Sequence, residues 1–209
     1  MFNYLFSLKS LRDKWVPFVF FIPFIYLLGW LLVMPLKILG LIVDQYNLSL
    51  VGTIVSFFLF IALLPKWVKI RWSSRECWKV IGLLGFNTSY IIKTFLKGII
   101  TSIGLISCVI IFVQLIIPIE FMWNLNTNLL INSILLGFGV GFAEEIIFRS
   151  WLWKELNFLV GSRFSMYLQA LFFSLIHIKF NLEFISIINL SFGLFLLGLV
   201  LSLRRKIDL

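Results

Sequence analysis

Long apolar stretches alternate with short polar segments along the 209-residue chain. A helix needs about 20 apolar residues to cross the hydrocarbon core of a bilayer. The stretches lack the two-residue alternation of membrane strands, and open sheet edges cannot be satisfied in lipid. The pattern therefore predicts an all-α polytopic transmembrane helix bundle with about six spans, at residues 16–36, 48–64, 98–118, 128–155, 163–180 and 184–203.

The composition also favours a membrane protein. Hydrophobic residues make up 61% of the chain and charged residues only 13%, whereas soluble domains contain about 45–50% and about 25%. Disordered, collagenous, disulfide-rich and nucleic-acid-binding proteins are excluded, because each class needs more polar, Gly/Pro or Cys residues. We expect a single membrane domain over residues 1–209, with the lipid bilayer as a partner and no nucleic acid.

Lys and Arg are distributed unevenly between the predicted loops. Three precede the first span, seven lie between Lys66 and Lys97, and three lie near the C-terminus, whereas the loops of the other side carry only Lys37 and Lys179. By the positive-inside rule, the N-terminus, a basic loop over residues 65–97 and the C-terminus are expected in the cytoplasm. The expected location is a bacterial cell membrane, which the chain crosses several times.

The basic loop carries a helix-start signal of its own. Ser73 and Glu76 have the spacing of a capping box with Ser73 as the N-cap, which predicts that a short helix follows. Tryptophans stand among the cations of this loop: Trp67, Trp72 and Trp78. This helix is expected either to contact anionic lipid headgroups or to serve as an aromatic-belt connector between spans.

The fourth predicted span contains ionisable residues, namely Glu144, Glu145 and Arg149. Each such charge costs about 2.5–3.5 kcal/mol near the bilayer centre on insertion scales, so these residues indicate a functional site. Glu145 and Arg149 lie four residues apart on one helical face and are expected to neutralise each other. Glu144 points about 100° away and is expected to act as a general base for water. The alternative is an ion pair between Glu144 and a cation on another span.

The fifth predicted span supplies the only histidine of the chain, His177, on the same helical face as Phe173. A lone histidine in an apolar segment is more often a packing residue than a catalyst. Counted from the loop that the two spans share, Glu144 lies about 11 residues along one helix and His177 about 14 along the next, so their heights differ by less than one turn. The spacing therefore predicts that the carboxylate and the imidazole come together.

These residues resemble two motifs of the CAAX-prenyl-protease and bacteriocin-processing family of intramembrane proteases, also called the ABI family. The motif Glu-Glu-x-x-x-Arg matches Glu144, Glu145 and Arg149, and the motif Phe-x-x-x-His matches Phe173 and His177. Either motif alone is weak, but together, in this order and on consecutive predicted spans, they are specific. The resemblance covers a core region of about residues 128–203.

The resemblance implies hydrolysis of peptide bonds inside the membrane, with a peptide or a membrane protein as the substrate. Glu144 would activate water and His177 would help to hold it, while Glu145 and Arg149 would form a structural pair that orients the site. Members of the family have been called metalloproteases, but a catalytic zinc usually needs three protein ligands. We expect no cofactor and a metal-free mechanism, and a divalent metal stays open as the alternative.

Family members typically carry a further helix with a second histidine and, four residues later, an asparagine, which stabilise the oxyanion. This sequence has no second histidine and stops at Leu209, which predicts either a truncated member or an inactive relative. Two functions therefore compete with the endopeptidase. One is a catalytically inactive membrane scaffold or immunity-type protein, and the other is a transporter in which Glu144 and His177 relay protons.

Overall fold

The computed structural model describes residues 2–41, 45–117 and 126–208, which contain no β-strand. The predicted all-α class is therefore confirmed. The elements are α1 (Phe2–Ile38), α2 (Gln45–Arg71), α3 (Cys77–Val80), α4 (Thr88–Ile116), α5 (Thr127–Glu144), the π-helix η1 (Glu145–Leu152), α6 (Trp153–Val160), α7 (Ser162–Ile176) and α8 (Phe184–Asp208).

Five of the described helical stretches are long and apolar enough to cross a membrane: Lys14–Ile38, Leu48–Arg71, Thr88–Ile116, Thr127–Val160 and Phe184–Arg205. The span expected at 163–180 corresponds to α7, whose 15 residues fall short of the about 20 that a straight crossing needs. The expectation of about six spans agrees with these five helices together with α7. The chain is an integral membrane protein.

The basic loop is shorter than the sequence predicted. The prediction placed it at 65–97, but α2 continues to Arg71 and α4 already begins at Thr88. Hydropathy marks the apolar centre of a span, whereas a helix continues into the polar region where long Lys and Arg side chains reach water. The start of α4 is set by Asn87, whose side chain accepts a hydrogen bond from the Ser89 backbone N–H, as an N-cap residue does.

The capping box within this loop is wrong, although the short helix that it predicted exists as α3. Ser73 has a φ of 53° and α3 begins only at Cys77, so that Glu76 occupies the N-cap position without a side-chain cap. The Ser74 hydroxyl accepts a hydrogen bond from the Glu76 N–H at 3.3 Å. This local turn competes with the capping geometry, as serine side chains often do.

A buried tryptophan joins the N-terminal helices to the later half of the chain. Trp151 of η1 is 1% exposed, and its ring lies 5.5–6.0 Å from the rings of Phe18, Phe21, Phe60 and Trp67. These four partners belong to α1 and α2. At such distances tilted and edge-on ring pairs add stabilisation beyond the burial of apolar area.

A buried carboxylate lies beside this aromatic cluster. Glu155 of α6 is fully buried, and its Oε2 accepts hydrogen bonds from the indole N–H groups of Trp67 at 3.0 Å and Trp72 at 2.7 Å. Its Oε1 accepts from Arg71 Nε at 2.9 Å and forms an ion pair with the same guanidinium. Arg71 also donates to the Lys14 carbonyl oxygen. Both carboxylate oxygens are thus satisfied, as a buried charge requires.

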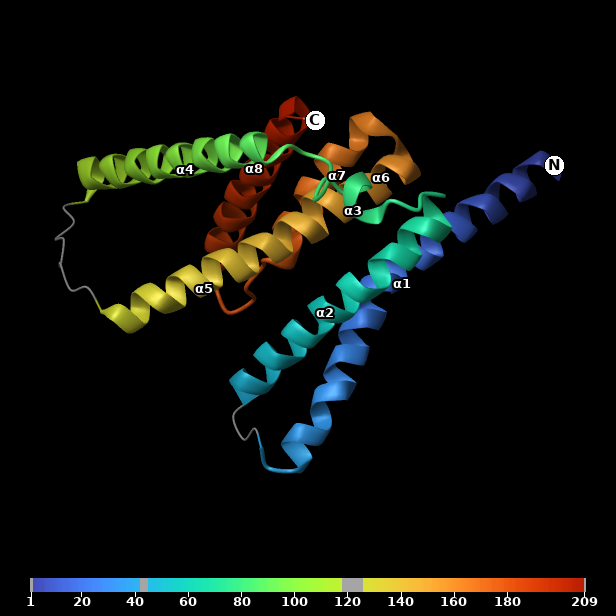
Figure 1. Ribbon diagram of the computed structural model, residues 1–209, viewed down its shortest axis with the longest axis horizontal. Coiled ribbons are helices and arrows are strands. Elements are labelled where there is room, and N and C mark those ends of the chain that lie inside the picture. Colours follow the sequence, from blue (N-terminus) through green and yellow to red (C-terminus); the bar gives the residue numbers. More distant parts are fainter. Residues whose placement is uncertain (1, 42–44, 118–125, 209) are drawn as a thin grey trace.

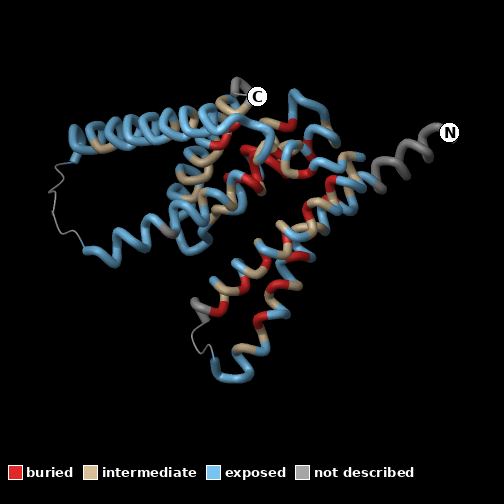
Figure 2. The backbone as a smooth tube through the Cα atoms, in the orientation of Figure 1, coloured by how far each residue is buried: buried red, intermediate tan, exposed pale blue. Residues whose placement is uncertain are grey.

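Buried residues lie in η1, α6 and α7 and along the α1–α2 pair (Figure 2). From η1 and α6, the α1–α2 pair extends in one direction and α5 in another (Figure 1). By contrast, α4 contains no buried residue, so its apolar side chains face outward along its whole length. In a bilayer, lipid covers such a surface without a penalty.

Small residues hold α7 close to α8. A Cβ added at Gly198 of α8 would lie only 3.1 Å from Ala170 of α7, so the helices approach there more closely than larger side chains permit. The Ser174 hydroxyl on α7 also donates to the Ser191 carbonyl oxygen on α8 at 2.6 Å. These contacts fix the helix that carries His177.

Replacing Glu155 with Gln tests the contact between the two halves. We expect the substitution to lower the free energy of unfolding by about 3–5 kcal/mol, because it leaves the Arg71 guanidinium, only 11% exposed, without its counter-charge. The matched control is Glu76→Gln, which breaks an exposed pair with Lys79 and is expected to cost less than about 1 kcal/mol. Unfolding in mixed detergent micelles measures both values, and equal losses would contradict the assignment.

The packing of α3 can be tested by thiol labelling. Cys77 is 4% exposed, and burial raises the pKa of its thiol, so the reactive thiolate is scarce at neutral pH. In a Cys108→Ser background, we expect N-ethylmaleimide to label folded protein much more slowly than unfolded protein. The rate is expected to rise as the pH increases. Equal labelling rates in the folded and unfolded states would show that α3 is not packed.

Candidate active site

The two adjacent glutamates lie where the helix changes its geometry. Glu144 is the last residue of α5, and Glu145 begins the π-helix η1, which continues to Leu152. The π-geometry widens the turn, and such segments occur frequently at functional sites. The segment contains no Gly or Pro, so no residue in its sequence indicated the change.

The structure brings Glu144 and His177 together, as the spacing predicted. His177 Nε2 lies 3.3 Å from Glu144 Oε1, although the two residues are 33 positions apart. Their side chains are 32% and 29% exposed, respectively. His177 occupies the C-cap position of α7, so the imidazole lies at a helix end.

The hydrogen bond of His177 to the backbone indicates which ring nitrogen faces Glu144. Nδ1 lies 2.7 Å from the Phe173 carbonyl oxygen, and since a carbonyl only accepts, Nδ1 carries a proton. A neutral imidazole then has no proton on Nε2, which would face the carboxylate of Glu144 as a second acceptor. A proton between Nε2 and Oε1 would turn this contact into a hydrogen bond.

Phe173 is a platform for the site: its ring packs against the other side chains there. The sequence did not reveal this packing role. Its ring is 3% exposed and lies 4.6 Å from the His177 ring and 5.3 Å from the Phe148 ring. The central guanidinium carbon of Arg149 lies 4.1 Å from the ring centroid, which is a cation–π contact. The Phe173 ring thus contacts Phe148 and Arg149 of η1 as well as His177 at the end of α7.

The expected pair of Glu145 and Arg149 is present, with 3.5 Å between the carboxylate and guanidinium atoms. The Arg149 side chain is 1% exposed, whereas that of Glu145 is 52% exposed. Within the described part of the chain, Nε and Nη2 of Arg149 have no hydrogen-bond partner. The Phe173 ring and the Glu145 carboxylate therefore provide the compensation for this buried charge.

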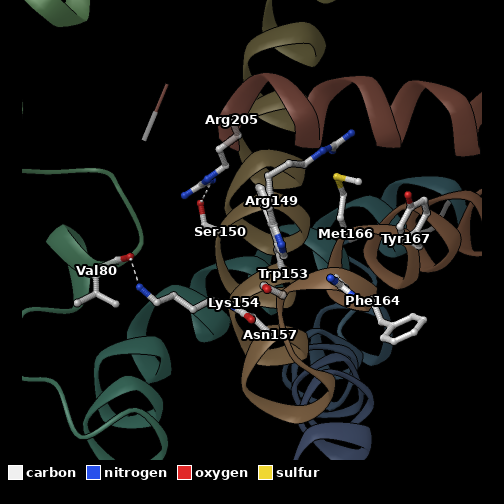
Figure 3. Close-up of a pocket in the computed structure, with 12 residues that line it drawn as sticks. Val80, Arg149, Ser150, Trp153, Lys154, Asn157, Phe164, Met166, Tyr167 and Arg205 are labelled. Carbon is white, nitrogen blue, oxygen red and sulfur yellow. Dashed lines mark hydrogen bonds between the residues drawn. The ribbon is translucent and has the colours of Figure 1, made fainter. Parts of the chain in front are cut away.

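A cavity of about 630 Å³ lies further along the same helix, on the side of α6. Its walls include Ser150, Lys154 and Arg205, but neither Glu144 nor His177 lines it (Figure 3). No pattern in the sequence indicated this cavity, because Lys154 and Arg205 are far apart in the chain and meet only where α6 and α8 pack together.

Comparison with known proteins identifies a family similarity over the segment that contains Glu144 and His177. The family model described as Type II CAAX prenyl endopeptidase Rce1-like matches residues 126–207. The family expected from the two motifs is confirmed. The matched segment, called the Rce1-like segment below, contains both motifs and is similar to this endopeptidase family. Residues 5–76 match a domain of unknown function, DUF8676. No curated protein and no solved structure matches the chain.

The donors of the Rce1-like segment do not fit a catalytic metal ion. Across residues 2–41, 45–117 and 126–208, no three His, Cys, Asp or Glu side chains are grouped for metal binding. Glu144 and His177 supply two ligands, whereas zinc usually takes three from the protein. The Glu145 carboxylate instead faces Arg149.

Phe173→Leu tests the platform inside the Rce1-like segment. The substitution keeps an apolar side chain but removes the ring contacts to Arg149, Phe148 and His177, which we expect to lower the free energy of unfolding by about 2 kcal/mol. Phe192→Leu is the control, because Phe192 is 62% exposed on α8. Unfolding in mixed micelles compares the two variants, and a Phe173→Leu protein as stable as the control would remove the platform role.

Proposed function

We propose that the chain is an intramembrane endopeptidase in which Glu144 activates water for attack on a peptide bond. The contact of 3.3 Å between Glu144 and His177 carries this proposal. A water molecule at hydrogen-bonding distance from both atoms lies within reach of a base and of a second polar group, as general-base catalysis requires. The match of residues 126–207 to an endopeptidase family supports the same reaction class.

The shared proton assigns a role to each partner. When the proton is on His177 Nε2, Glu144 is a carboxylate and accepts a proton from water as the water oxygen attacks the carbonyl carbon. The imidazolium N–H donates to the water or to the oxygen on which negative charge develops, which stabilises the tetrahedral intermediate. Glu144 then returns its proton to the leaving amine as the C–N bond breaks, so the base becomes the acid.

Glu145 and Arg149 position the site in this proposal and take no part in proton transfer. Glu145 faces the guanidinium of Arg149, and Arg149 lies on the Phe173 ring that also contacts His177. Through these contacts Glu145 and Arg149 fix the position of the His177 imidazole relative to Glu144. A displacement of about 1 Å at such a site lowers rates by about 100-fold.

The substrate class follows from the depth of Glu144 and His177 in the membrane. Glu144 lies near the middle of the stretch Thr127–Val160, so a scissile bond reaches it from within the bilayer. Prenylated protein tails, secreted leader peptides and membrane-anchored precursors are the candidates by family analogy. The charge asymmetry supports a cytoplasmic N-terminus, and a bacterial cell membrane is the proposed location.

Cleavage by the full chain in proteoliposomes tests the proposal. We expect Glu144→Gln to lower kcat/KM for a prenylated or membrane-anchored peptide by about 100- to 10,000-fold, because the amide cannot act as a base. The control is Glu183→Gln, the same chemical change at an exposed residue that contacts none of the site residues. Its rate is expected to equal that of the unsubstituted protein.

His177→Asn separates the two partners in the same assay, because asparagine still holds a water molecule but carries no charge. We expect a loss of rate smaller than that of Glu144→Gln. Unchanged cleavage by Glu144→Gln would remove Glu144 from the mechanism. A folded, reconstituted protein that cleaves no peptide in the library would instead favour the inactive scaffold.

A further inference from the structure

The cavity beside α6 is lined by cations from three parts of the chain, and no carboxylate is among the residues that line it. The cations are Arg149, Lys154, Arg163 and Arg205. Its volume of about 630 Å³ lies within the range of about 300–1,000 Å³ that is typical of ligand pockets. A negatively charged ligand is therefore the chemical class that this cavity favours.

Lys154 and Arg205 are hydrogen-bonded to neutral groups, whereas Arg149 pairs with Glu145. Lys154 Nζ donates to the Val80 carbonyl oxygen at 3.1 Å, and Arg205 donates to the Ser150 hydroxyl and the Ile81 carbonyl oxygen, both at 2.8 Å. Among the ion pairs of the described residues, none includes Lys154, Arg163 or Arg205. These bonds orient Lys154 and Arg205, and the nearby Glu145 carboxylate offsets only part of the charge of Arg205.

The cavity walls are polar on one side and apolar on the other. Figure 3 shows Lys154, Arg205 and Ser150 on one side of the cavity, whereas Met166, Phe164 and Tyr167 of α7 lie on the opposite side. Phe164 is 65% exposed and Tyr167 is 52% exposed. A ligand that matches both sides carries an anionic group next to an apolar part.

The depth of the cavity matches the headgroup region of a bilayer. The stretch Thr127–Val160 has 34 residues, or about 51 Å at 1.5 Å per residue, and the hydrocarbon core is about 30 Å thick. A helix centred in the bilayer therefore extends beyond the core by about 10 Å, or roughly seven residues, at each end. Lys154 and Asn157 fall in this terminal part, and Glu144 lies near the centre.

We propose that this cavity binds the phosphate headgroup of an acidic phospholipid from the surrounding leaflet. Lys154, Arg163 and Arg205 contact the phosphate and its net negative charge, and the α7 side chains contact the glycerol and the first part of the acyl chains. Basic pockets between membrane helices bind acidic lipid headgroups by the same electrostatics. The site is separate from Glu144 and His177, so its test does not depend on proteolysis.

Native mass spectrometry of the full chain in neutral detergent measures this binding directly. Dioleoyl phosphatidylglycerol and dioleoyl phosphatidylcholine are titrated separately, and we expect the anionic lipid to bind at least about tenfold more tightly. In a Lys154→Gln and Arg163→Gln double variant, the affinity for phosphatidylglycerol is expected to fall by about tenfold or more. Arg163→Gln alone changes an exposed residue, and its affinity for phosphatidylglycerol is expected to fall by about threefold to fivefold.

The matched control removes two exposed cations of α4, through Lys93→Gln and Lys97→Gln, and is expected to change the affinity less than about twofold. Equal affinity for the two lipids would overturn the proposal, and so would a double variant that binds phosphatidylglycerol as the control does. Soluble glycerol phosphate forms the third arm. If it binds as tightly as phosphatidylglycerol, the ligand is a free phosphate ester and the lipid assignment is wrong.

Discussion

The carboxylate of Glu155, fully buried in α6, is the interaction on which the arrangement of the helices depends. It accepts hydrogen bonds from Trp67, Arg71 and Trp72 of the N-terminal segment. Trp151, one turn before it, inserts its ring between Phe18 of α1 and Phe60 of α2. A buried charge of this kind is tolerated only with its partners in place. The segment that matches DUF8676 and the Rce1-like segment are therefore held in one relative position.

Three carboxylates within 12 residues have three different environments. Glu144 faces an imidazole, Glu145 faces Arg149 and Glu155 faces Arg71. Glu144 and Glu145 are partly exposed and Glu155 is not. Glu155 is hydrogen-bonded on both oxygens, whereas Glu144 has a contact with the His177 imidazole on one oxygen. Environment, more than residue type, separates the candidate base from the structural acids.

The sequence predicted the parts of the molecule that have a local or motif-level signal. Apolar length gave the spans, and equal height along two antiparallel helices gave the contact between Glu144 and His177. The loop boundaries were wrong by several residues, because hydropathy marks the apolar core of a span and not the ends of its helix. The capping box failed because Ser73 has a left-handed backbone conformation and α3 starts four residues later.

Other features had no signal that a single sequence could provide. Glu155 resembles an ordinary interfacial charge next to Trp153 and Lys154, and its partners lie 83 to 88 positions away. Nothing in the residues of η1 distinguishes a π-helix from an α-helix. The cavity of cations depends on α6, α7 and α8 meeting at one end, which is a property of the packed structure. Long-range contacts of this kind arise from tertiary packing rather than from local propensity.

The central claim of the proposal is that His177 Nε2 carries a proton that it donates to the Glu144 carboxylate, at the end of α5. Because the chain has a single histidine, ¹⁵N-histidine labelling reports on His177 alone by magnetic resonance. We predict a protonated Nδ1 and an Nε2 signal that moves to the unprotonated position in Glu144→Gln, while Glu183→Gln leaves it unchanged. An Nδ1 without a proton, or identical spectra for the native protein and Glu144→Gln, would contradict the account.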